Sequence, residues 1–258
     1  MTRGRTVTRR RAAAVVVVAA VAALTGCAAD EPAGARLVVL AAASLTDVLP
    51  PIAEQFERTH PGTQVVLSFG GSAGLAQSVA AGAPADVLAV ASPAALQVVL
   101  DSGDSVGEPV VFARNSLEIA VPTGNPGAVT GLADFARDDL DLAVCAAQVP
   151  CGAAAASAFT VARVDPRPDT LEQDVRAVLT KVRTGEVDAG LVYATDVRAA
   201  GDDVEGVTLP PAQRVPADYP AVALSGGASP DLAADLVAAL LGADAQRELA
   251  AAGFLPPL

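Results

Sequence analysis

The amino-acid sequence predicts an α/β protein with two lobes, each a mixed, mostly parallel sheet flanked by helices, and with a ligand cleft between the lobes. Three observations lead to this prediction. Short apolar runs alternate with Ala-rich helical patterns, which is typical of parallel strands joined by crossover helices. A second unit of this kind begins near residue 115. The last segments resemble a return to the first unit, so we expect two segments, residues 114–121 and 219–224, to cross between the lobes.

The first lobe begins with three strand–helix pairs. Pro61 and Gly62 end the first helical pattern, and Gly103 follows the third. Pro50 and Pro51 remove two backbone donors just past the first turn of the first helix, and we expect them to bend or loosen it. The pairs are predicted as strands at residues 36–44, 63–69 and 85–91 and as helices at residues 45–60, 73–82 and 93–103.

The second lobe opens with a strand of alternating polarity and a Pro/Gly-rich turn at residues 115–127. Residues 164–173 are expected to form a connection, and a strand that starts at Asp218 leads to two closing helices. Lobe 1 therefore comprises residues 36–114 and 220–258, and lobe 2 comprises residues 115–219. The other elements of lobe 2 are predicted as strands at residues 141–145 and 188–193 and as helices at residues 132–140, 151–163 and 174–185, with a short helix from Ala194.

The N-terminus has the pattern of an export signal with a lipid attachment site. Arginines precede an apolar run at residues 12–24, which is too short to span a bilayer, and LTGC follows at residues 24–27. This ending resembles the lipobox of bacterial lipoproteins, in which the cysteine is acylated and becomes the new N-terminus. We expect residues 1–26 to be a lipoprotein signal peptide and residues 27–35 a tether, with the exported protein anchored to the outer face of the cell membrane through Cys27. An ordinary signal with a chance cysteine is the alternative.

The chain is acidic, with a formal net charge of −12. Loss of residues 1–26 removes five arginines and no acid, which changes this charge to −17. Such a protein repels phosphates, which argues against nucleic acid as a partner. Net charge cannot attract an anion either, so any anion site must rely on local dipoles.

The sequence lacks the residues that common enzymes need. The single histidine, His60, is expected at a helix end, which excludes a multi-histidine metal site. No GxSxG, Walker A or GxGxxG pattern is present, and the glycine-rich segment SFGGSAG lacks the lysine of a nucleotide-phosphate loop. Asp86 precedes a strand, where hydrogen bonding to a loop is the commoner role. Catalysis is therefore the weaker hypothesis, and no cofactor is expected.

Several strand–helix junctions share a chemistry that suits an anion. A helix N-terminus leaves backbone N–H groups without intrahelical partners and carries a partial positive charge, so several termini around one cleft can bind an oxyanion without Lys or Arg. Each junction alone has an ordinary explanation: Ser44 and Asp47 match a capping pair, and Tyr193 matches a boundary residue with a satisfied hydroxyl. The hypothesis depends on the combination. The candidate positions are Ser44, Ser72, Cys151, Val175 with the preceding Asp174, and Tyr193.

Five segments occur in the order seen in one protein family. They are AAASLTD, SFGGSAGLAQSVAAGAPADV, QVPCG, EQDVRAVLTKVRTGEVDAGLVYATD and YPAVAL. Through them the chain resembles, from residue 37 to residue 254, the periplasmic molybdate-binding proteins of ABC importers, which have the type 2 periplasmic-binding-protein fold. Single segments of this kind could mislead, but five in order rarely do.

The resemblance implies a site for molybdate or tungstate. In that family two serine side chains with their backbone amides, two further amides and a tyrosine hydroxyl hold the tetrahedral oxyanion. Carried over by motif, these positions are Ser44, Ser72, Cys151, Val175 and Tyr193, and no protein atom is a direct ligand of molybdenum. Cys151 stands where many relatives have a small residue, which adds a thiol at the pocket but leaves the amide in place.

Two cysteines remain besides the predicted lipidation site. Cys145 and Cys151 are six residues apart, and an even number of remaining cysteines in an exported protein favours a disulfide. The end of a strand and the start of the next helix can lie close enough for this bridge. It would hold the amide of Cys151 at a fixed angle. Two free buried thiols are the alternative.

We therefore expect a monomeric, lipid-anchored binding protein that captures molybdate, and tungstate as well, and delivers it to a membrane permease driven by an ATPase. The nearest alternative is a binding protein for another oxyanion such as sulfate. A secreted hydrolase that uses Ser44 or Ser72 is less favoured because general bases are scarce. A sensory or structural lipoprotein that binds the oxyanion without transport is a further alternative.

Overall fold

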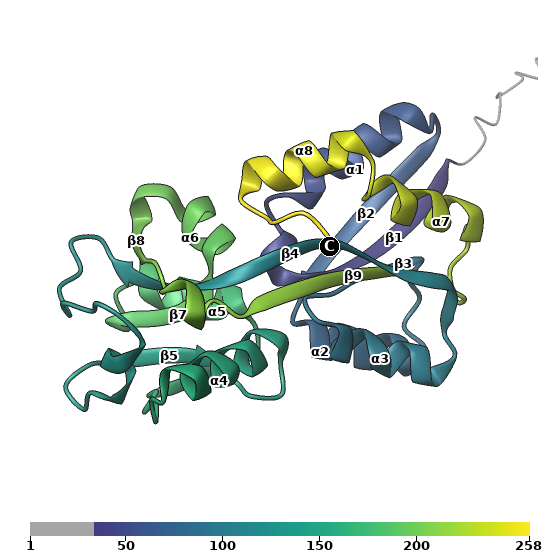
Figure 1. Ribbon diagram of the computed structural model, residues 1–258. Coiled ribbons are helices and arrows are strands. Elements are labelled where there is room, and N and C mark those ends of the chain that lie inside the picture. Colours follow the sequence, from purple (N-terminus) through teal and green to yellow (C-terminus); the bar gives the residue numbers. More distant parts are fainter. Residues whose placement is uncertain (1–33) are drawn as a thin grey trace, which may run out of the picture. The chain divides into compact units, whose positions relative to one another are not determined.

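A computed structural model describes residues 34–258 of the chain (Figure 1). The predicted signal peptide, Cys27 and most of the tether lie outside the described residues. Within the described part, no helix combines the length and the apolar character needed to cross a membrane. The strands are β1 Ala35–Ala42, β2 Thr63–Gly70, β3 Val87–Ala89, β4 Ser105–Pro122, β5 Leu142–Cys145, β6 Thr170–Glu172, β7 Ala189–Tyr193, β8 Val204–Val207 and β9 Pro216–Leu224.

Helices connect most of these strands. The α-helices are α1 Leu49–Thr59, α2 Ser72–Ala80, α3 Pro93–Ser102, α4 Pro150–Ala162, α5 Val175–Arg183, α6 Ala194–Ala200, α7 Pro230–Ala239 and α8 Ala243–Ala252. The 3₁₀ helices are η1 Ala43–Leu45, η2 Leu132–Ala136, η3 Gly201–Asp203 and η4 Pro211–Gln213.

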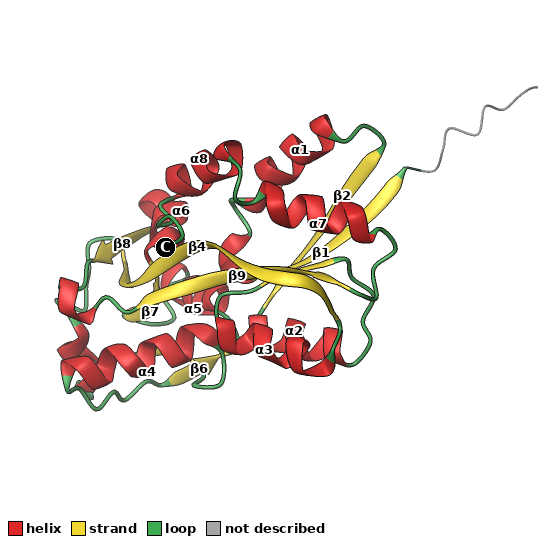
Figure 2. Cartoon of the chain, turned by 45° about the vertical axis from the view of Figure 1, so that its right-hand side comes forward, coloured by secondary structure: helices red, strands yellow, loops and turns green. Residues whose placement is uncertain are grey.

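The strands form one continuous sheet in the order β2-β1-β3-β9-β4-β7-β5-β6, with β8 paired to β4 (Figure 2). The 18-residue strand β4 belongs to both parts of this sheet. Up to Ser116 it pairs with β9, and from Leu117 it pairs with β7. We call β2, β1, β3, β9 and residues 105–116 sheet A, and residues 117–122, β7, β8, β5 and β6 sheet B.

Parallel pairing dominates the outer strands of both sheets, and antiparallel pairing joins them at the centre. Strand β1 pairs in parallel with β2 and β3, and β5 pairs in parallel with β6 and β7. Strands β9 and β4 are antiparallel to their neighbours. The carboxyl ends of the parallel strands therefore come together in each sheet, which is where α/β sheets bind ligands.

Strands β3 and β7, which flank the central pair β9 and β4, are buried on both faces. Every residue of β3 and of β7 is buried, so these strands appear in the sequence as continuous apolar runs. Helices α2 and α3 cover one face of sheet A, and α1, α7 and α8 cover the other (Figure 1). This layering agrees with the predicted α/β class.

The first helix starts later than predicted. Residues 43–45 form a 3₁₀ turn, and α1 begins at Leu49 instead of residue 45. Pro50 and Pro51 therefore lie in the first turn, where backbone N–H groups have no intrahelical partner and proline removes no bond. The prediction that these prolines bend or loosen the helix is wrong for this reason.

Three further local predictions differ from the structure. The helix predicted at residues 132–140 is the shorter η2, and the expected connection at residues 164–173 contains β6. Strand β8 was not predicted. Strands β6 and β8 each pair with one neighbour and are only three and four residues long, so they carry little hydrophobic pattern of their own. The lobe boundaries proposed above stay a prediction.

Candidate functional site

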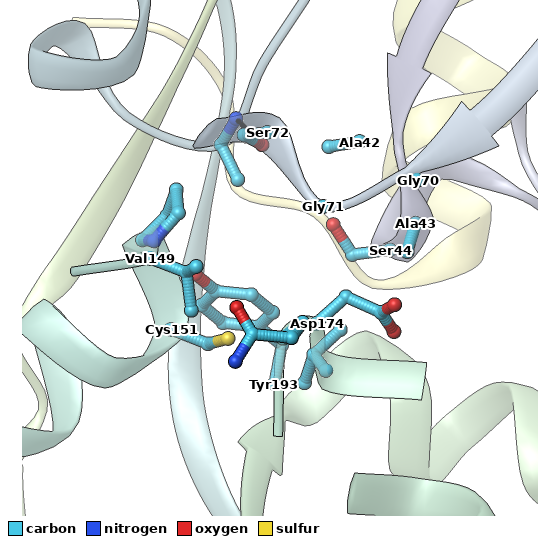
Figure 3. Close-up of a pocket in the computed structure, with 14 residues that line it drawn as sticks. Ala42, Ala43, Ser44, Gly70, Gly71, Ser72, Val149, Cys151, Asp174 and Tyr193 are labelled. Carbon is cyan, nitrogen blue, oxygen red and sulfur yellow. Dashed lines mark hydrogen bonds between the residues drawn. The ribbon is translucent and has the colours of Figure 1, made fainter. Parts of the chain in front are cut away.

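All five residues singled out in the sequence line one small cavity of about 20 Å³ (Figure 3). The cavity lies where loops of sheet A meet loops of sheet B. It is lined by Ala42, Ala43, Ser44, Gly70, Gly71, Ser72, Ala91, Val149, Pro150, Cys151, Gln173, Asp174, Val175 and Tyr193. Residues as far apart in the chain as Ala42 and Tyr193 thus meet at one point.

Sheet A supplies the two serines. Ser44 lies in η1 directly after β1, and Ser72 is the first residue of α2 after β2. Strands β1 and β2 are parallel and end in register, with Ala42 opposite Gly70. Both serines therefore leave the same edge of the sheet, and both are buried.

Sheet B supplies the other three positions. Cys151 is in the first turn of α4, Val175 is the first residue of α5, and Tyr193 is the last residue of β7. Helices α4 and α5 follow β5 and β6, which are parallel to each other, so their N-termini also lie at one edge. The parallel pairing in each sheet is what brings helix N-termini to the cavity.

The helix N-termini at the cavity keep backbone donors free. Helices α2 and α4 begin without a side-chain cap, at Gly71 and Val149. In α5 the carboxylate of Asp174 accepts hydrogen bonds from the backbone N–H groups of Arg176 and Ala177, which leaves the N–H of Val175 outside this cap. First-turn N–H groups have no intrahelical acceptor, so they are available to an anion.

The three hydroxyl groups differ in their partners. The Ser44 hydroxyl lies 2.8 Å from the hydroxyl of Tyr219, so Ser44 does not cap a helix as the pairing with Asp47 would predict. The Ser72 hydroxyl accepts a hydrogen bond of 3.1 Å from the backbone N–H of Ala91. The Tyr193 hydroxyl is buried and has no hydrogen-bond partner among the described residues.

Burial keeps Tyr193 protonated. It raises the pKa of the Tyr193 hydroxyl well above its ordinary value, and the neighbouring Tyr219 and Asp196 raise the pKa further. Burying a hydroxyl that has no hydrogen-bond partner costs free energy unless some group accepts a hydrogen bond from it. Because Tyr193 lines the cavity, an acceptor in the cavity would satisfy it.

The cavity is lined by neutral donors and no cationic side chain. Among the described residues, no Lys, Arg or His lines it, and its one acid, Asp174, is engaged in capping α5. Arg176 and Arg198 line a neighbouring cavity of about 150 Å³ together with Ser44. Arg176 pairs with Asp47 and with the buried Asp196, so acidic partners balance its charge.

A disulfide joins the end of β5 to the first turn of α4. The Cα atoms of Cys145 and Cys151 are 5.6 Å apart. The turn is so close that a Cβ on Gly152 would lie 1.9 Å from the backbone oxygen of Ala146, so only glycine fits there. The bridge and the close approach together hold the backbone amide of Cys151 in place.

Two residues considered as candidates lie elsewhere. His60 ends α1, where its ring stacks on Phe56 at 3.9 Å, and it does not line the cavity. Asp86 is buried and accepts hydrogen bonds from the backbone N–H groups of Val38 and Ser229, which is a structural role. Within the described residues, no group of three or more His, Cys, Asp or Glu is placed to hold a metal ion.

Some residues of the site were not identified as such from the sequence. Tyr219 and Asn115 contact each other behind Ser44, and Gly71 lies against the loop before α5. Tyr219 is part of the segment YPAVAL, which carries the family resemblance, but nothing in that segment indicates contact with Ser44. The contact joins residues 175 positions apart, and local sequence patterns do not report such distances.

Comparisons with known proteins agree with this geometry. Residues 37–255 match the family described as bacterial extracellular solute-binding protein. The molybdate-binding protein ModA of Mycobacterium tuberculosis H37Rv is 37% identical over 243 residues, covering 91% of this chain and 93% of that protein. The molybdate-binding protein ModA of Haemophilus influenzae is 32% identical over 203 residues, covering 75% of this chain and 80% of that protein.

Solved structures show the same fold. The periplasmic molybdate-binding protein of Azotobacter vinelandii matches with a TM-score of 0.73 at 23% identity, covering 86% of this chain and 100% of that one. The sulfate-binding protein SubI of Mycobacterium tuberculosis matches with a TM-score of 0.77 at 18% identity, covering 86% of this chain and 87% of that one. At these identities the likeness concerns the fold, and it confirms the predicted two-lobed α/β class.

Proposed function

Because the chain belongs to the family of bacterial extracellular solute-binding proteins, we propose that it captures molybdate outside the cytoplasm for an ABC importer. The observation that carries the proposal is the cavity itself, in which hydroxyls and helix N-termini converge without a cationic side chain. The named relatives with 30% identity or more include proteins named for binding molybdate. Tungstate, which has the same shape and charge, is proposed as a second ligand.

The donors present are sufficient to bury a dianion. Burying an unpaired ion costs tens of kcal/mol in an idealised apolar medium. A hydrogen bond to a charged group contributes about 1.5–3 kcal/mol. The proposed donors are the hydroxyls of Ser44, Ser72 and Tyr193 and the backbone N–H groups of Ser44, Ser72, Cys151 and Val175. Together they supply on the order of 10–20 kcal/mol, which is comparable to the smaller penalty in a real protein.

A site of donors alone selects by protonation. Phosphate near neutral pH carries a proton that needs an acceptor, whereas molybdate, tungstate and sulfate carry none. Such a site disfavours phosphate but does not by its chemistry exclude sulfate. Sulfate is therefore the nearest alternative ligand, and discrimination against it must come from the size of the cavity.

Delivery to the importer completes the proposed function. We infer that the two lobes close on the ion and that the closed form docks on a membrane permease driven by an ATPase. Cys27, outside the described residues, is the proposed site of a lipid anchor, with residues 1–26 removed as a signal peptide. The proposed active form is a monomer without a cofactor.

Hydrolase activity has little support at this site. A serine nucleophile needs a general base within hydrogen-bond reach. The side chain hydrogen-bonded to the Ser44 hydroxyl is the protonated Tyr219, and the Ser72 hydroxyl accepts from a backbone amide. Release of product from ester substrates would contradict this view.

Calorimetric titration tests the assignment. We expect the protein to bind molybdate and tungstate tightly, sulfate weakly and phosphate least. Ser44→Ala and Tyr193→Phe should each weaken molybdate binding at least tenfold, because each removes one donor from a buried dianion. Ser102→Ala, which removes an exposed hydroxyl outside the cavity, is the matched control and should bind as the wild type does. Unchanged titration curves for both site variants would remove the assignment.

A further inference from the structure

Tyr219 lies directly behind the cavity without lining it. It is in β9, is fully buried, and its hydroxyl is 2.8 Å from the Ser44 hydroxyl. Its ring packs edge-on against Tyr193 and Phe254, with ring centroids 6.0 Å and 5.4 Å away. This packing fixes the position of the phenol oxygen relative to Ser44.

Either hydroxyl could donate in the Tyr219–Ser44 hydrogen bond, and the contacts of Asn115 favour Tyr219 as the donor. The side-chain oxygen of Asn115 accepts a hydrogen bond of 2.9 Å from the backbone N–H of Ser116, which fixes the orientation of the amide. Its nitrogen donates to Thr195 at 2.8 Å and faces the Tyr219 hydroxyl at 3.5 Å. An amide nitrogen cannot accept a hydrogen bond, so of these two neighbours only the Ser44 hydroxyl can accept from the Tyr219 hydroxyl.

The Tyr219 hydroxyl carries the proton that this direction requires. Burial raises its pKa above the ordinary value, so the phenol keeps its proton. A phenol is also a stronger donor than an aliphatic hydroxyl. Ser44 therefore receives a hydrogen bond, and its own proton is left to point into the cavity.

Ser72 receives a hydrogen bond of a different kind. Its donor is the backbone N–H of Ala91, which cannot reverse its role. The donor to Ser44 is a hydroxyl, which could in principle accept instead. The backbone N–H of Ala91 therefore leaves the Ser72 hydroxyl free to donate to the cavity. Whether the Ser44 hydroxyl donates to the cavity depends on Tyr219 and Asn115.

We propose that Tyr219, oriented by Asn115, is a positioning residue that holds the Ser44 hydroxyl as a donor and so makes the site reject oxyanions that carry a proton. This inference rests on the proposed function, because it concerns the selectivity of the same site. Without the phenol, the Ser44 hydroxyl can turn and accept a hydrogen bond from a protonated oxyanion. Tyr219 would then determine specificity without contacting the ligand.

The test compares molybdate with inorganic phosphate by titration of wild type and Tyr219→Phe. We expect Tyr219→Phe to weaken molybdate binding about fivefold and to reduce the ratio of molybdate affinity to phosphate affinity at least tenfold. A general structural defect would weaken both ligands and leave their ratio unchanged. An unchanged ratio would therefore overturn the inference.

Two double-mutant cycles separate action through Ser44 from a general effect. In a Ser44→Ala background, Tyr219→Phe should cause no further loss of molybdate affinity, because its target is absent. In a Ser72→Ala background, the effect of Tyr219→Phe should be the same as in the wild type. Additive losses in both cycles would contradict a role through Ser44.

A measurement on the unmodified chain keeps the inference testable if Tyr219→Phe does not fold. The chain has two tyrosines, so selective ¹³C labelling of the phenol carbon gives one NMR signal for each, assigned with Tyr193→Phe. On addition of molybdate, the signal of Tyr193 should shift strongly as its unpartnered hydroxyl gains an acceptor, and that of Tyr219 should stay nearly unchanged. A larger shift at Tyr219 would show that its hydrogen bond is not preset and would overturn the inference.

The wild-type titration distinguishes failure of the inference about Tyr219 from failure of the proposed function. If the wild type binds molybdate but the affinity ratio is unchanged in Tyr219→Phe, the inference fails and the proposed function stands. If the wild type binds no oxyanion, both fail.

Discussion

Asp196 is a side chain with no exposed surface in the first turn of α6, three residues after Tyr193. It accepts a hydrogen bond of 3.1 Å from the backbone N–H of Tyr193, and the guanidinium of Arg176 is 3.0 Å away. Burial raises the pKa of Asp196 to about 7, although Arg176 and the Tyr193 amide oppose this rise. The residue that supports the backbone of Tyr193 is therefore sensitive to pH in the neutral range.

This pKa predicts how stability depends on pH. An aspartate with a raised native pKa holds its proton more tightly in the folded than in the unfolded chain between about pH 4 and pH 7. Its contribution to the free energy of unfolding therefore falls as pH rises through this window. Asp196→Asn removes the titration, so urea unfolding should show the variant gaining more than about 1 kcal/mol relative to wild type from pH 5 to pH 8.

An exposed aspartate provides a control of opposite sign. The guanidinium of Arg137 donates to Asp139 and lowers its pKa. Its contribution is present above the unfolded pKa and is lost as pH falls, so Asp139→Asn should not gain stability relative to wild type at pH 8. Parallel pH curves for wild type and Asp196→Asn would contradict the raised pKa.

At the scale of elements, the first turn of α4 depends on the disulfide. A bridge across so short a loop contributes about 2 kcal/mol in the chain-entropy treatment. Cys145→Ser/Cys151→Ser should therefore lower the free energy of unfolding by about 2 kcal/mol and weaken molybdate binding severalfold, because the amide of residue 151 is less firmly held. Chemical denaturation and calorimetry measure the two effects.

Thiol counting provides an independent check of the same bridge. In the unfolded, unreduced protein, Cys145 and Cys151 should contribute no reactive thiol, and after reduction they should contribute two. Two reactive thiols before reduction would show that the pair is free in the isolated protein.

At the scale of the whole described chain, one glycine allows the loops of sheet A and sheet B to meet. Gly71, the residue before α2, faces the loop before α5, and a Cβ there would lie 2.6 Å from the backbone oxygen of Gln173. Its φ of −64° is one that alanine adopts easily, so an alanine would act by its bulk and not by backbone strain.

Gly71→Ala is therefore expected to hold the loop of sheet A that contains residue 71 away from the loop of sheet B that contains Gln173. Molybdate affinity should fall at least tenfold, and the free energy of unfolding of the ligand-free protein should fall by about 1–3 kcal/mol. Gly74→Ala is the matched control, since a Cβ at Gly74 meets no atom within 4 Å. Equal affinities of the two variants in calorimetric titration would argue against close approach at Gly71 during binding.

Much of the fold could be predicted because its signals are local. The runs that form β1, β2, β3 and β7 are largely apolar, and helices follow them at recognisable junctions, so the α/β class and the strand ends follow from composition and order. The start of α1 was predicted too early. Prolines such as Pro50 and Pro51 are compatible with the first turn of a helix but disrupt later turns, so the sequence did not show which turn they occupy. Strands β6 and β8 were missed because pairing with a single neighbour defines them more than their own residues do.

The sequence by itself determined which residues could donate to an anion, because helix N-termini, serines at strand ends and a tyrosine after an apolar run are local features. The tertiary structure alone decided that these donors face one cavity, that Tyr219 contacts Ser44, and that Gly71 fits against Gln173. The reason is physical. Hydrogen-bond direction and steric fit depend on atoms brought together by sheet pairing across more than a hundred residues, and no local periodicity records that pairing.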